Sequence, residues 1–553
     1  MKVALALLSG AAVALTSCND MLETQPYGSF TDEQMDDDAI EGLIAASYAG
    51  LEAHFFGNNP AFAGPSTNWI FDVRSDDALK GGGGISMESN IHQLEISNLT
   101  STNESCLYKW QNDYYAISRV NTALKAIFST HNLDTDVQAT YVGELYFLRA
   151  FYYFDLYRIF ERFPYITEDD NASEVRYDNK TREEIFDEIT WNLKVAYENL
   201  PATRSQAGRA GRYAAAALLA RVNAYESKWD QVAEYAKAVI DCGQYSLYDN
   251  YGDMSKIDFN NKQESIFALQ CSNVNDNAHI NWSNLLNVTY SEGNLYGNGD
   301  DFFLASQNLV NAFRTNSTTG LPFLAGDAPA EDVTENYSGS LDPRLDYTVG
   351  RIGLPWRDNG QGAYVYGESW CRAMDVYGEY SGKKWCISPE DPMCLHTFPY
   401  SSPLNFIFIR YADVLLLRAE ALIEQNTSLN EARELINQVR EKAQRSADQA
   451  GTYTPVDLDP NKADYYVGLY SASGWTQDYA RKAVRMERRL ELAMEGQRWF
   501  DLCRWGNVVD TMNSYFQSES KFESYYSEAQ MSENEKFLPI PYDEVNNSYG
   551  LYE

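Results

Sequence analysis

The sequence has 553 residues, of which 44% are hydrophobic, so it is long enough for several packed units around an ordinary globular core. Its formal net charge is −35. This excess of carboxylates argues against a nucleic-acid-binding protein, because phosphate contacts need clustered Lys and Arg side chains. It suits an exposed surface that repels its neighbours. Aromatic residues make up 14% of the chain, including 40 Tyr and 11 Trp, which is unusually rich.

The N-terminus has the pattern of an export signal followed by a lipid attachment site. Lys2 precedes an apolar run at residues 3–15, shorter than the about 20 residues that span a bilayer. The tripeptide Leu-Thr-Ser then precedes Cys18, which looks like a bacterial lipobox. We therefore predict a signal peptide at 1–17, acylation of Cys18 and a polar tether at 18–30. The alternative is an ordinary signal peptide with an incidental Cys. No later apolar run is long enough to span a membrane, so the protein is expected to sit on a membrane by its lipid.

Helical periodicity dominates the predicted N-terminal part, residues 31–271. Apolar residues recur at steps of three and four, the spacing of amphipathic helices. We expect helices at residues 40–51, 110–128, 141–159, 182–199 and 213–225, with a further helix ending at 241. Residues 68–88 include four consecutive glycines, Gly81 to Gly84. Because such a run holds neither a helix nor a stable strand, this segment is predicted to be a mobile loop.

The pattern changes at residues 272–404, where helical periodicity fades and four of the 11 Trp occur. Long irregular segments in a helical protein are more often functional than idle, so we predict a ligand-binding lobe here. Helix pairs return in the predicted C-terminal helical part, 405–553. They are expected at 411–424 with 429–444, and at 479–495 with 499–512. The sequence thus predicts a mainly α-helical protein, a tetratricopeptide-like helical-repeat scaffold with an inserted irregular, loop-rich lobe.

Five segments in chain order resemble the SusD/RagB family of outer-membrane nutrient-binding lipoproteins. They are ELYFLRAFYYF at 144–154, DPRL at 342–345, IRYADVLLLRAEA at 409–421, ERRLELAMEGQRWFDL at 487–502 and FLPIP at 537–541. With the lipobox, the similarity covers essentially the whole mature chain. The resemblance implies four tetratricopeptide-like units packed against a more irregular lobe, which agrees with the division drawn from the periodicity.

The resemblance also implies a function. Proteins of this family mostly bind oligosaccharides or polysaccharides at the cell surface without cutting them, and a minority bind peptides. It implies a SusC-type TonB-dependent transporter as partner, which the lipoprotein covers as a lid. On this basis we expect a lipid-anchored protein of the outer membrane surface, with a glycan ligand and no cofactor.

Enzyme and metal motifs are not found in the sequence. It contains no His-Glu-x-x-His, no Gly-x-Ser-x-Gly and no Walker lysine loop. Glu491, Glu495 and Arg498 share one helical face, but alternating charges around them favour scaffold ion pairs over catalysis. Asp457, Asp459 and Asn461 begin like a calcium loop but lack its glycine and terminal Glu, so a structural calcium is left without a location.

Single His and Cys residues are interpreted as structural. The five His are scattered: His54, His92, His131, His279 and His396. The seven Cys after Cys18 show no Cys-x-x-Cys spacing. Cys371, Cys386 and Cys394 are close enough in sequence for a disulfide, while several of the others are expected to be small buried apolar residues.

Aromatic and charged side chains of the two loop regions are the predicted ligand contacts. An aromatic face can stack on the apolar face of a sugar, while carboxylates and guanidinium groups bond its hydroxyls. The candidates are Trp69, Arg74 and Asp77 from the first loop, and Trp282, Tyr290, Tyr296, Trp356 and Arg372 from the irregular lobe. The alternative for each aromatic is core packing.

Three rival functions remain open from the sequence. The same architecture could bind peptides, since peptides also occupy aromatic grooves. A surface glycoside hydrolase would need two carboxylates about 5–10 Å apart in a cleft, and no such pair is indicated. A structural helical-repeat lipoprotein that assembles other envelope proteins would have no need of an irregular lobe rich in Trp, Tyr and Gly.

Overall fold

The computed structural model describes residues 37–52, 64–129, 133–273, 280–290, 295–324, 327–397, 400–448 and 455–552. The predicted signal peptide, the tether and Cys18 lie outside these residues, as do His54, His131 and His279. Helices predominate, as the periodicity predicts. None of the helices in the described ranges combines the length and apolarity that a membrane span requires.

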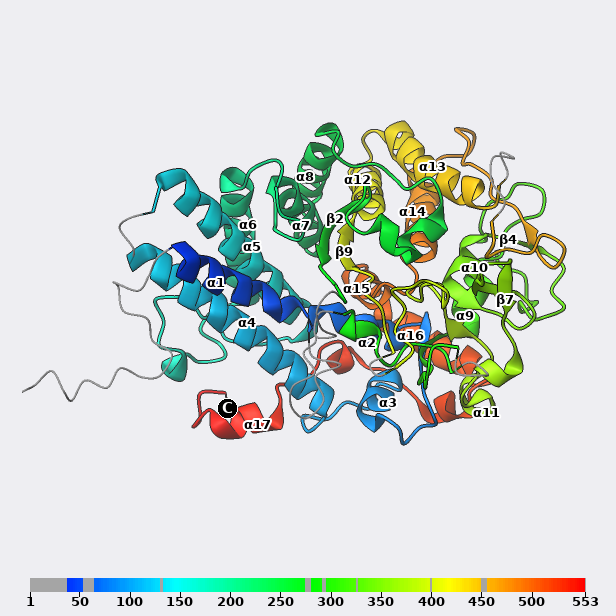
Figure 1. Cartoon of the computed structure of the whole chain (residues 1–553), viewed down its shortest axis with the longest axis horizontal. Helices are drawn as coiled ribbons and strands as arrows, with labels where there is room; N and C mark the ends of the chain where they lie inside the picture. Colours follow the sequence, from blue (N-terminus) through cyan, green and yellow to red (C-terminus); the bar gives the residue numbers. More distant parts are fainter. Residues whose placement is uncertain are drawn as a thin grey trace, which may run out of the picture.

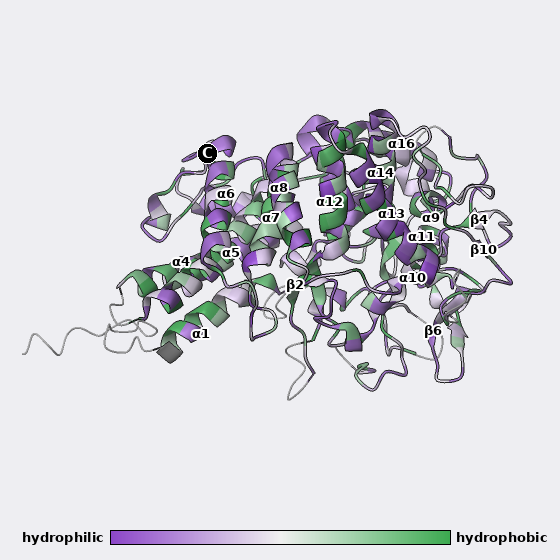
Figure 2. Ribbon diagram, turned by 90° about the horizontal axis from the view of Figure 1, so that it is seen from above, coloured by the Kyte–Doolittle hydropathy of each residue, from purple (hydrophilic) through white to green (hydrophobic). Residues whose placement is uncertain are grey.

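A row of long helices forms one half of the molecule (Figure 1). Each helix packs against the next one along the chain, as in tetratricopeptide-like repeats. The helices are α1 (Asp37–Tyr48), α4 (Glu104–Ser129), α5 (Thr135–Ile159), α6 (Arg182–Asn199), α7 (Arg212–Tyr225) and α8 (Trp229–Asp241). Seen from above, the row continues past α8 to further helices and carries hydrophobic stretches within α7 and α12 (Figure 2).

The row continues after a long insertion. α8 ends at Asp241, yet it packs against α12 (Tyr411–Glu424), which in turn packs against α13 (Leu429–Ser446) and α14 (Gln477–Glu491). Strands β2 (Ser265–Leu269) and β9 (Phe406–Arg410) pair antiparallel. This pairing brings together the two ends of the chain segment between the strands. The residues of that segment therefore form an inserted lobe on a continuous helical row. The domain boundaries at 272 and 404 stay a prediction.

The remaining elements are short. The helices are α2 (Trp69–Val73), α3 (Ser89–Glu95), α9 (Gln307–Ala312), α10 (Arg344–Thr348), α11 (Met374–Tyr377), α15 (Arg498–Arg504), α16 (Val508–Glu519) and α17 (Tyr542–Asn547). The strands are β1 (Ala78–Gly81), β3 (Phe302–Ala305), β4 (Ser340–Leu341), β5 (Val349–Gly350), β6 (Pro355–Asp358), β7 (Ala363–Val365), β8 (Ser381–Gly382) and β10 (Asp464–Tyr465). Their described pairs are β1–β3, β4–β10, β5–β8 and β6–β7.

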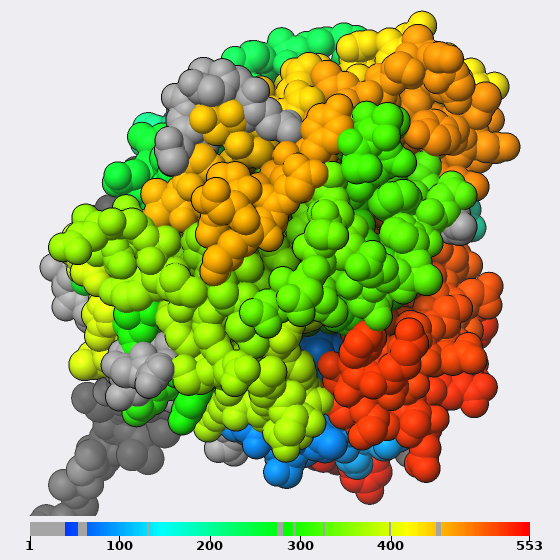
Figure 3. Space-filling model, turned by 90° about the vertical axis from the view of Figure 1, so that its right-hand side faces the viewer, coloured from blue at the N-terminus to red at the C-terminus, as the bar shows by residue number. Residues whose placement is uncertain are grey.

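The lobe forms one end of the molecule (Figure 3). Its green and yellow-green surface lies between the orange segments that follow α13 and the red segments around α16. The lobe therefore lies beside two separate segments of the C-terminal part of the chain.

Gly50, just after α1, lies in close contact with α4 and α5 of the helical row. A Cβ at this position would lie 2.3 Å from the Ala116 Cβ and 2.9 Å from the Tyr152 hydroxyl. We therefore expect Gly50→Ala to lower the free energy of unfolding by about 1–3 kcal/mol, the usual cost of overpacking. Chemical denaturation monitored by circular dichroism would measure it. Gly42→Ala, where a Cβ meets nothing within 4 Å, is the matched control, and an equal loss in both variants would contradict this explanation.

Two predicted helices near the C-terminus have the wrong bounds. The helix expected at 479–495 ends at Glu491, and the one expected at 499–512 is divided into α15 and α16. Met494, Gly496 and Gly506 have φ values of 60°, 72° and 72°, a left-handed conformation that interrupts an α-helix. The backbone N–H groups of Gly496 and Arg498 donate to Asp72 at 2.6 and 3.1 Å. The break between α14 and α15 is therefore held by a carboxylate from far away in sequence. α14 packs against α12 and α13.

The prediction of a mobile loop at 68–88 is wrong. This segment contains α2 and β1, and β1 pairs with β3, placing Ala78 opposite Ala305. Its carboxylates are buried, and those of Asp76 and Asp77 bind Arg498 and Arg489. Gly81 has φ 76°, and a Cβ there would lie 2.4 Å from the Asp301 carbonyl oxygen. The glycine that suggested mobility is thus required for a close backbone contact.

A buried network of opposite charges joins the lobe to the helical row. Glu491 accepts from Arg410 and Lys442, each at 2.6 Å, and from Arg344 at 3.0 Å. Arg410 also binds Glu264 and Glu495. These carboxylates are bound by cations and buried, as expected for scaffold ion pairs. The expectation that Glu491, Glu495 and Arg498 share one helical face is wrong, because α14 ends at Glu491 and Arg498 begins α15.

Candidate functional site

Five of the eight predicted ligand contacts are buried, which corrects the prediction for them. Each is at most 4% exposed: Trp69, Arg74, Asp77, Tyr296 and Trp356. Trp69 packs against Phe303 with ring centroids 5.3 Å apart. The Trp356 indole N–H donates to the Tyr296 hydroxyl at 2.9 Å. Because their faces are covered by protein, these side chains offer a surface ligand nothing to stack on or bind.

The two charged residues among the five have structural partners. The Arg74 guanidinium lies over the Trp499 ring at 3.9 Å and donates to the Glu535 carbonyl. Asp77 accepts from Arg489 at 2.7 Å. Burial lowers the pKa of Arg74 to about 10, and only protein groups surround it. Both residues hold the loop segment against the C-terminal helices.

Two of the remaining candidates lie together on the surface. Tyr290 is 45% exposed, and the half-buried Arg372 places its guanidinium carbon 5.8 Å from the Tyr290 ring centre. Arg372 forms an ion pair with Asp300. A ring, a guanidinium and a carboxylate thus face solvent from three segments of the lobe. We call these three residues, with the turn at Gly81 to Gly84, the lobe site. Trp282 is half-buried outside this group, and its role stays a prediction.

The glycine turn beside Arg372 is held by hydrogen bonds from Lys80. The Lys80 ammonium donates to the carbonyl groups of Gly81, Gly84 and Met87 at 2.9, 3.0 and 2.6 Å. A Cβ at Gly83 would lie 3.2 Å from the Arg372 Nε, and one at Gly84 would meet nothing within 4 Å. The turn therefore leaves the guanidinium uncovered and an open space beside it. Asp300 and Lys80 were not predicted from sequence, although the run of glycines was the signal for this turn.

The backbone beneath the lobe site is fixed by Asp301. Its carboxylate accepts from the Arg372 backbone N–H at 3.1 Å and from the Ser381 hydroxyl at 2.6 Å. Burial raises the pKa of Asp301 to about 6, against the lowering effect of these hydrogen bonds. Because Arg372 is anchored at its backbone and paired at its side chain, its guanidinium is preorganised for an incoming hydroxyl or ring oxygen.

A buried group of acids lies near the glycine turn. Glu95 accepts from the Lys80 backbone N–H at 3.0 Å and from the hydroxyl groups of Tyr525 and Tyr526. Glu523 is 4% exposed, and burial, followed by the nearby Glu519 and Glu95, raises its pKa to about 9. A carboxyl group held in the protonated form at neutral pH therefore supports this side of the lobe.

This group predicts a pH dependence of stability. The folded protein keeps a proton on Glu523 that the unfolded chain releases above its ordinary pKa, so stability falls as pH rises from about 5 to about 9. Glu523→Gln should remove up to about 1.4 kcal/mol per pH unit of that slope. Urea unfolding at pH 5, 7 and 9 measures it. Glu528→Gln, an exposed site in the same region, serves as control, and parallel slopes for wild type and Glu523→Gln would contradict the assignment.

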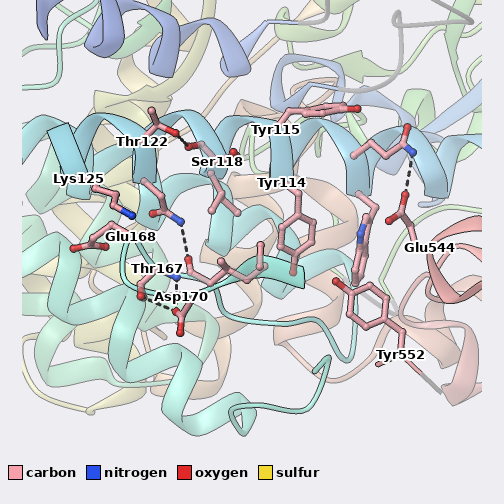
Figure 4. A pocket seen from close by; sticks show the side chains of 16 residues that line it. Tyr114, Tyr115, Ser118, Thr122, Lys125, Thr167, Glu168, Asp170, Glu544 and Tyr552 are labelled. Atoms are coloured by element: carbon pink, nitrogen blue, oxygen red, sulfur yellow. Dashed lines mark hydrogen bonds between the residues drawn. The ribbon is translucent and has the colours of Figure 1, made fainter. Parts of the chain in front are cut away.

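A surface groove lies on the helical half. This helical groove, about 490 Å³ in volume, lies between α4, the loop at 166–172 and the C-terminal segment (Figure 4). Its walls are aromatic: Trp110, Tyr114, Tyr115 and Tyr552. Figure 4 shows Lys125 and Glu168 at one end and Glu544 and Tyr552 at the other. Sequence reasoning missed it, because its walls come from segments over 400 residues apart.

Most polar groups of the helical groove are already bonded to the protein. Tyr114 donates to the Pro164 carbonyl at 2.6 Å, Gln111 donates to Glu544 at 2.9 Å, and Thr167 donates to Asp170 at 2.7 Å. Tyr115, 67% exposed, is the most open ring of the wall. The groove has the shape of a binding site but few unoccupied groups to orient a ligand, so the lobe site is the stronger candidate.

Metal-binding and nucleophilic groups are not gathered at either surface. Within the described ranges, no three His, Cys, Asp or Glu side chains are placed to hold a metal ion. Asp457, where the partial calcium pattern begins, pairs with Lys383 and Arg357 at 3.1 and 3.3 Å. His92 pairs with Glu95, and His396 bonds two backbone carbonyl groups. All seven thiols after Cys18, including Cys371, Cys386 and Cys394, are free in the structure.

Family models match two long segments of the chain. Residues 263–553 match the model described as the SusD family. Residues 66–223 match a model described as starch-binding associating with outer membrane. Among curated proteins, the chain is 26% identical to SusD-like protein P38 of Formosa agariphila over 520 residues, covering 90% of each. It is 25% identical to a SusD-like protein of Bacteroides ovatus, covering 94% of this chain and 85% of that protein.

Solved structures share the fold. A SusD-like carbohydrate binding protein from Bacteroides fragilis superposes with a TM-score of 0.71 at 22% identity, covering 92% of this chain and 98% of that one. The surface glycan-binding protein A of Bacteroides thetaiotaomicron, in complex with laminarihexaose, has a TM-score of 0.68 at 18% identity, covering 94% and 98%. A laminarin binding SusD-like protein has a TM-score of 0.64 at 22% identity, covering 92% and 97%.

Proposed function

This chain belongs to the SusD family, and from that premise we propose that it is a cell-surface lipoprotein that captures a glycan through the lobe site. The observation that carries the proposal is the exposed pair of Tyr290 and Arg372. The Tyr290 ring stacks on the apolar face of a sugar, and the Arg372 guanidinium donates to its oxygen atoms. One fold neighbour in complex with laminarihexaose and another named as laminarin binding support the ligand class.

The captured glycan is delivered to a TonB-dependent transporter of the SusC type. The acylated Cys18 holds the protein on the outer membrane, in agreement with the outer-membrane association named for its family model. Because the lobe is inserted in a rigid helical row, the protein presents its ligand at one end while the helices remain available to a partner. Affinity purification of the protein from intact outer membranes should recover a large barrel transporter.

Binding without cleavage is the proposed chemistry. Glu491 and Glu495, assigned to scaffold ion pairs from the sequence, are buried and bound by Arg410 and other cations, so they are not available as general acid and base. In the lobe site, Asp300 is paired with Arg372. Among the residues that the structure describes, this site has groups that orient a sugar, and its one partly exposed carboxylate, Asp300, is the one paired with Arg372.

Calorimetric titration tests the function directly. Full-length protein in detergent is titrated with plant, microbial and host glycans and with a peptide digest, and the products are then analysed. We expect saturable binding of one glycan class with no shortening of its chains. Binding of peptides alone would favour the peptide-binding alternative, and released products would overturn the non-catalytic proposal.

A further inference from the structure

A strongly basic groove lies on this acidic protein, away from the lobe site. Its volume is about 460 Å³, and its walls come from α9, α14, α15 and the start of α16. Five basic side chains and one carboxylate line it: Arg314, Lys482, Arg485, Arg489, Arg498 and Asp76. In a chain with a net charge of −35, such a local excess of positive charge calls for a physical explanation.

Two of these cations are neutralised within the protein. Arg498 binds Asp76 with its Nε and Nη2 atoms at 2.7 and 2.9 Å. Arg489 binds Asp77 at 2.7 Å and the Asn308 side-chain oxygen at 2.8 Å. Their role is to hold the segment at 72–77 against α14 and α15, and they contribute little net charge to the groove.

The other three cations have no carboxylate partner in the described parts of the chain. Arg314 donates only to backbone carbonyl groups, those of Asn311, Pro329 and Glu331. Lys482 is exposed and forms no ion pair there. Arg485 lies over the Trp505 ring at 4.9 Å, and its buried Nε has no hydrogen-bond partner. Burial lowers the pKa of both Arg485 and Arg314, as expected for cations that lack a close anion.

The acids nearest Arg485 are occupied by other groups. Glu420 accepts from the Arg504 guanidinium at 2.7 and 2.8 Å and from the Trp505 indole N–H at 2.7 Å. Glu424 accepts from Arg481 at 2.7 and 2.9 Å. Near Arg314, Asp332 accepts from the Asn311 amide at 2.8 Å. Among the described residues these acids therefore offer Arg485 no vacant acceptor, which leaves its guanidinium available to an outside anion.

We propose that this basic groove is a second ligand site that binds the carboxylate or sulfate group of an anionic oligosaccharide between Arg485, Lys482 and Arg314. Trp505 and Met486 supply an apolar wall for a sugar ring, and Asn507 and Thr511 supply groups that bond its hydroxyls. The saccharide part of the assignment rests on the proposed glycan capture; the anionic part rests on the uncompensated cations. The groove would select acidic glycans over neutral ones.

Titration with matched saccharides tests the proposal. Full-length protein in detergent is titrated with a uronic-acid trisaccharide, a sulfated galactose disaccharide, their neutral counterparts, an Asp/Glu peptide and sodium sulfate, while Trp fluorescence is followed. We expect at least one acidic saccharide to bind, with affinity that falls as salt is raised. Arg485→Gln should weaken it by about ten- to hundredfold, and Arg485→Lys should restore part of the loss.

The controls distinguish binding in the basic groove from binding at the lobe site and from an effect of misfolding. Lys194→Gln removes an exposed lysine on α6, outside the groove, and should leave binding unchanged. Thermal unfolding of Arg485→Gln should match wild type. Binding that is abolished by Tyr290→Ala but indifferent to Arg485→Gln would overturn the second site while leaving the proposed function intact. Equal binding of acidic and neutral saccharides, preference for the peptide, or binding of sulfate alone would also overturn it.

Discussion

Glu491→Gln should lower the free energy of unfolding by about 3–5 kcal/mol, the cost of breaking a buried ion pair on one side. The substitution keeps the size of the side chain and removes its charge. Lys442, Arg410 and Arg344 would then surround a neutral amide, and the amide N–H groups of Gln would face cations that are also donors. All three buried cations would lose the negative charge that they share, and one of the two oxygen acceptors would be replaced by a donor.

The electrostatics of Glu491 explain why the loss should be large. Burial alone would raise its pKa, yet Lys442, Arg410 and Arg344 hold the pKa well below its ordinary range. Above the acidic pH range, the ionised carboxylate therefore stabilises the folded state. This stabilisation is lost as the pH falls towards the pKa of Glu491 in the folded protein. Through Arg344 of α10, the network also joins the lobe to α13 and α14, so its loss loosens the lobe from the helical row.

Chemical denaturation at pH 7 measures this effect. Glu434→Gln is the matched control, because Glu434 is exposed and pairs with Arg433 at the surface; surface pairs contribute about 0–1 kcal/mol. A loss for Glu491→Gln no larger than that of Glu434→Gln would show that neighbouring groups compensate for the missing charge. Glycan binding by the folded fraction of the variant should be unchanged if Glu491 has only a scaffold role.

Long helices were predictable because their limits are local. The predicted helices at 182–199 and 411–424 coincide with α6 and α12. α6 begins at a capping box formed by Thr181 and Glu184 and ends just before Pro201, both visible in the sequence. By contrast, α14 ends early because Asp72, more than 400 residues away, binds the Gly496 backbone. The sequence around the end of α14 does not predict that contact.

To predict the site, one must know which side chains are buried in the fold. The sequence alone does not give this information. Trp356 and Tyr290 are equally plausible stacking residues by type. Trp356 is buried against Tyr366 and Trp370, whereas Tyr290 lies on the surface. Lys80 and Asp300 were missed because their roles come from backbone carbonyl groups and a side chain that only the fold brings near. The sequence shows that the lobe is rich in aromatic residues, but it does not show which of these residues are exposed to a ligand.

Tyr290→Ala should weaken binding of the captured glycan by about tenfold or more, equivalent to at least about 1.4 kcal/mol. The variant removes the stacking surface. It also removes the ring over which the Arg372 guanidinium lies. Arg372→Gln should also weaken binding, because it loses the donor groups and releases Asp300. Because Tyr290 is exposed, its loss should leave the unfolding temperature unchanged.

Tyr115→Ala in the helical groove provides the decisive comparison. Tyr115 is also an exposed ring, but the polar groups around it are mostly bonded to the protein, so we expect no effect on glycan affinity. Gly83→Val should weaken binding as Tyr290→Ala does, because the new side chain would cover Arg372. If Tyr115→Ala abolished binding while Tyr290→Ala and Gly83→Val did not, the ligand would lie in the helical groove. The direct contacts with the sugar would then come from the scaffold, and the inserted lobe would need another role.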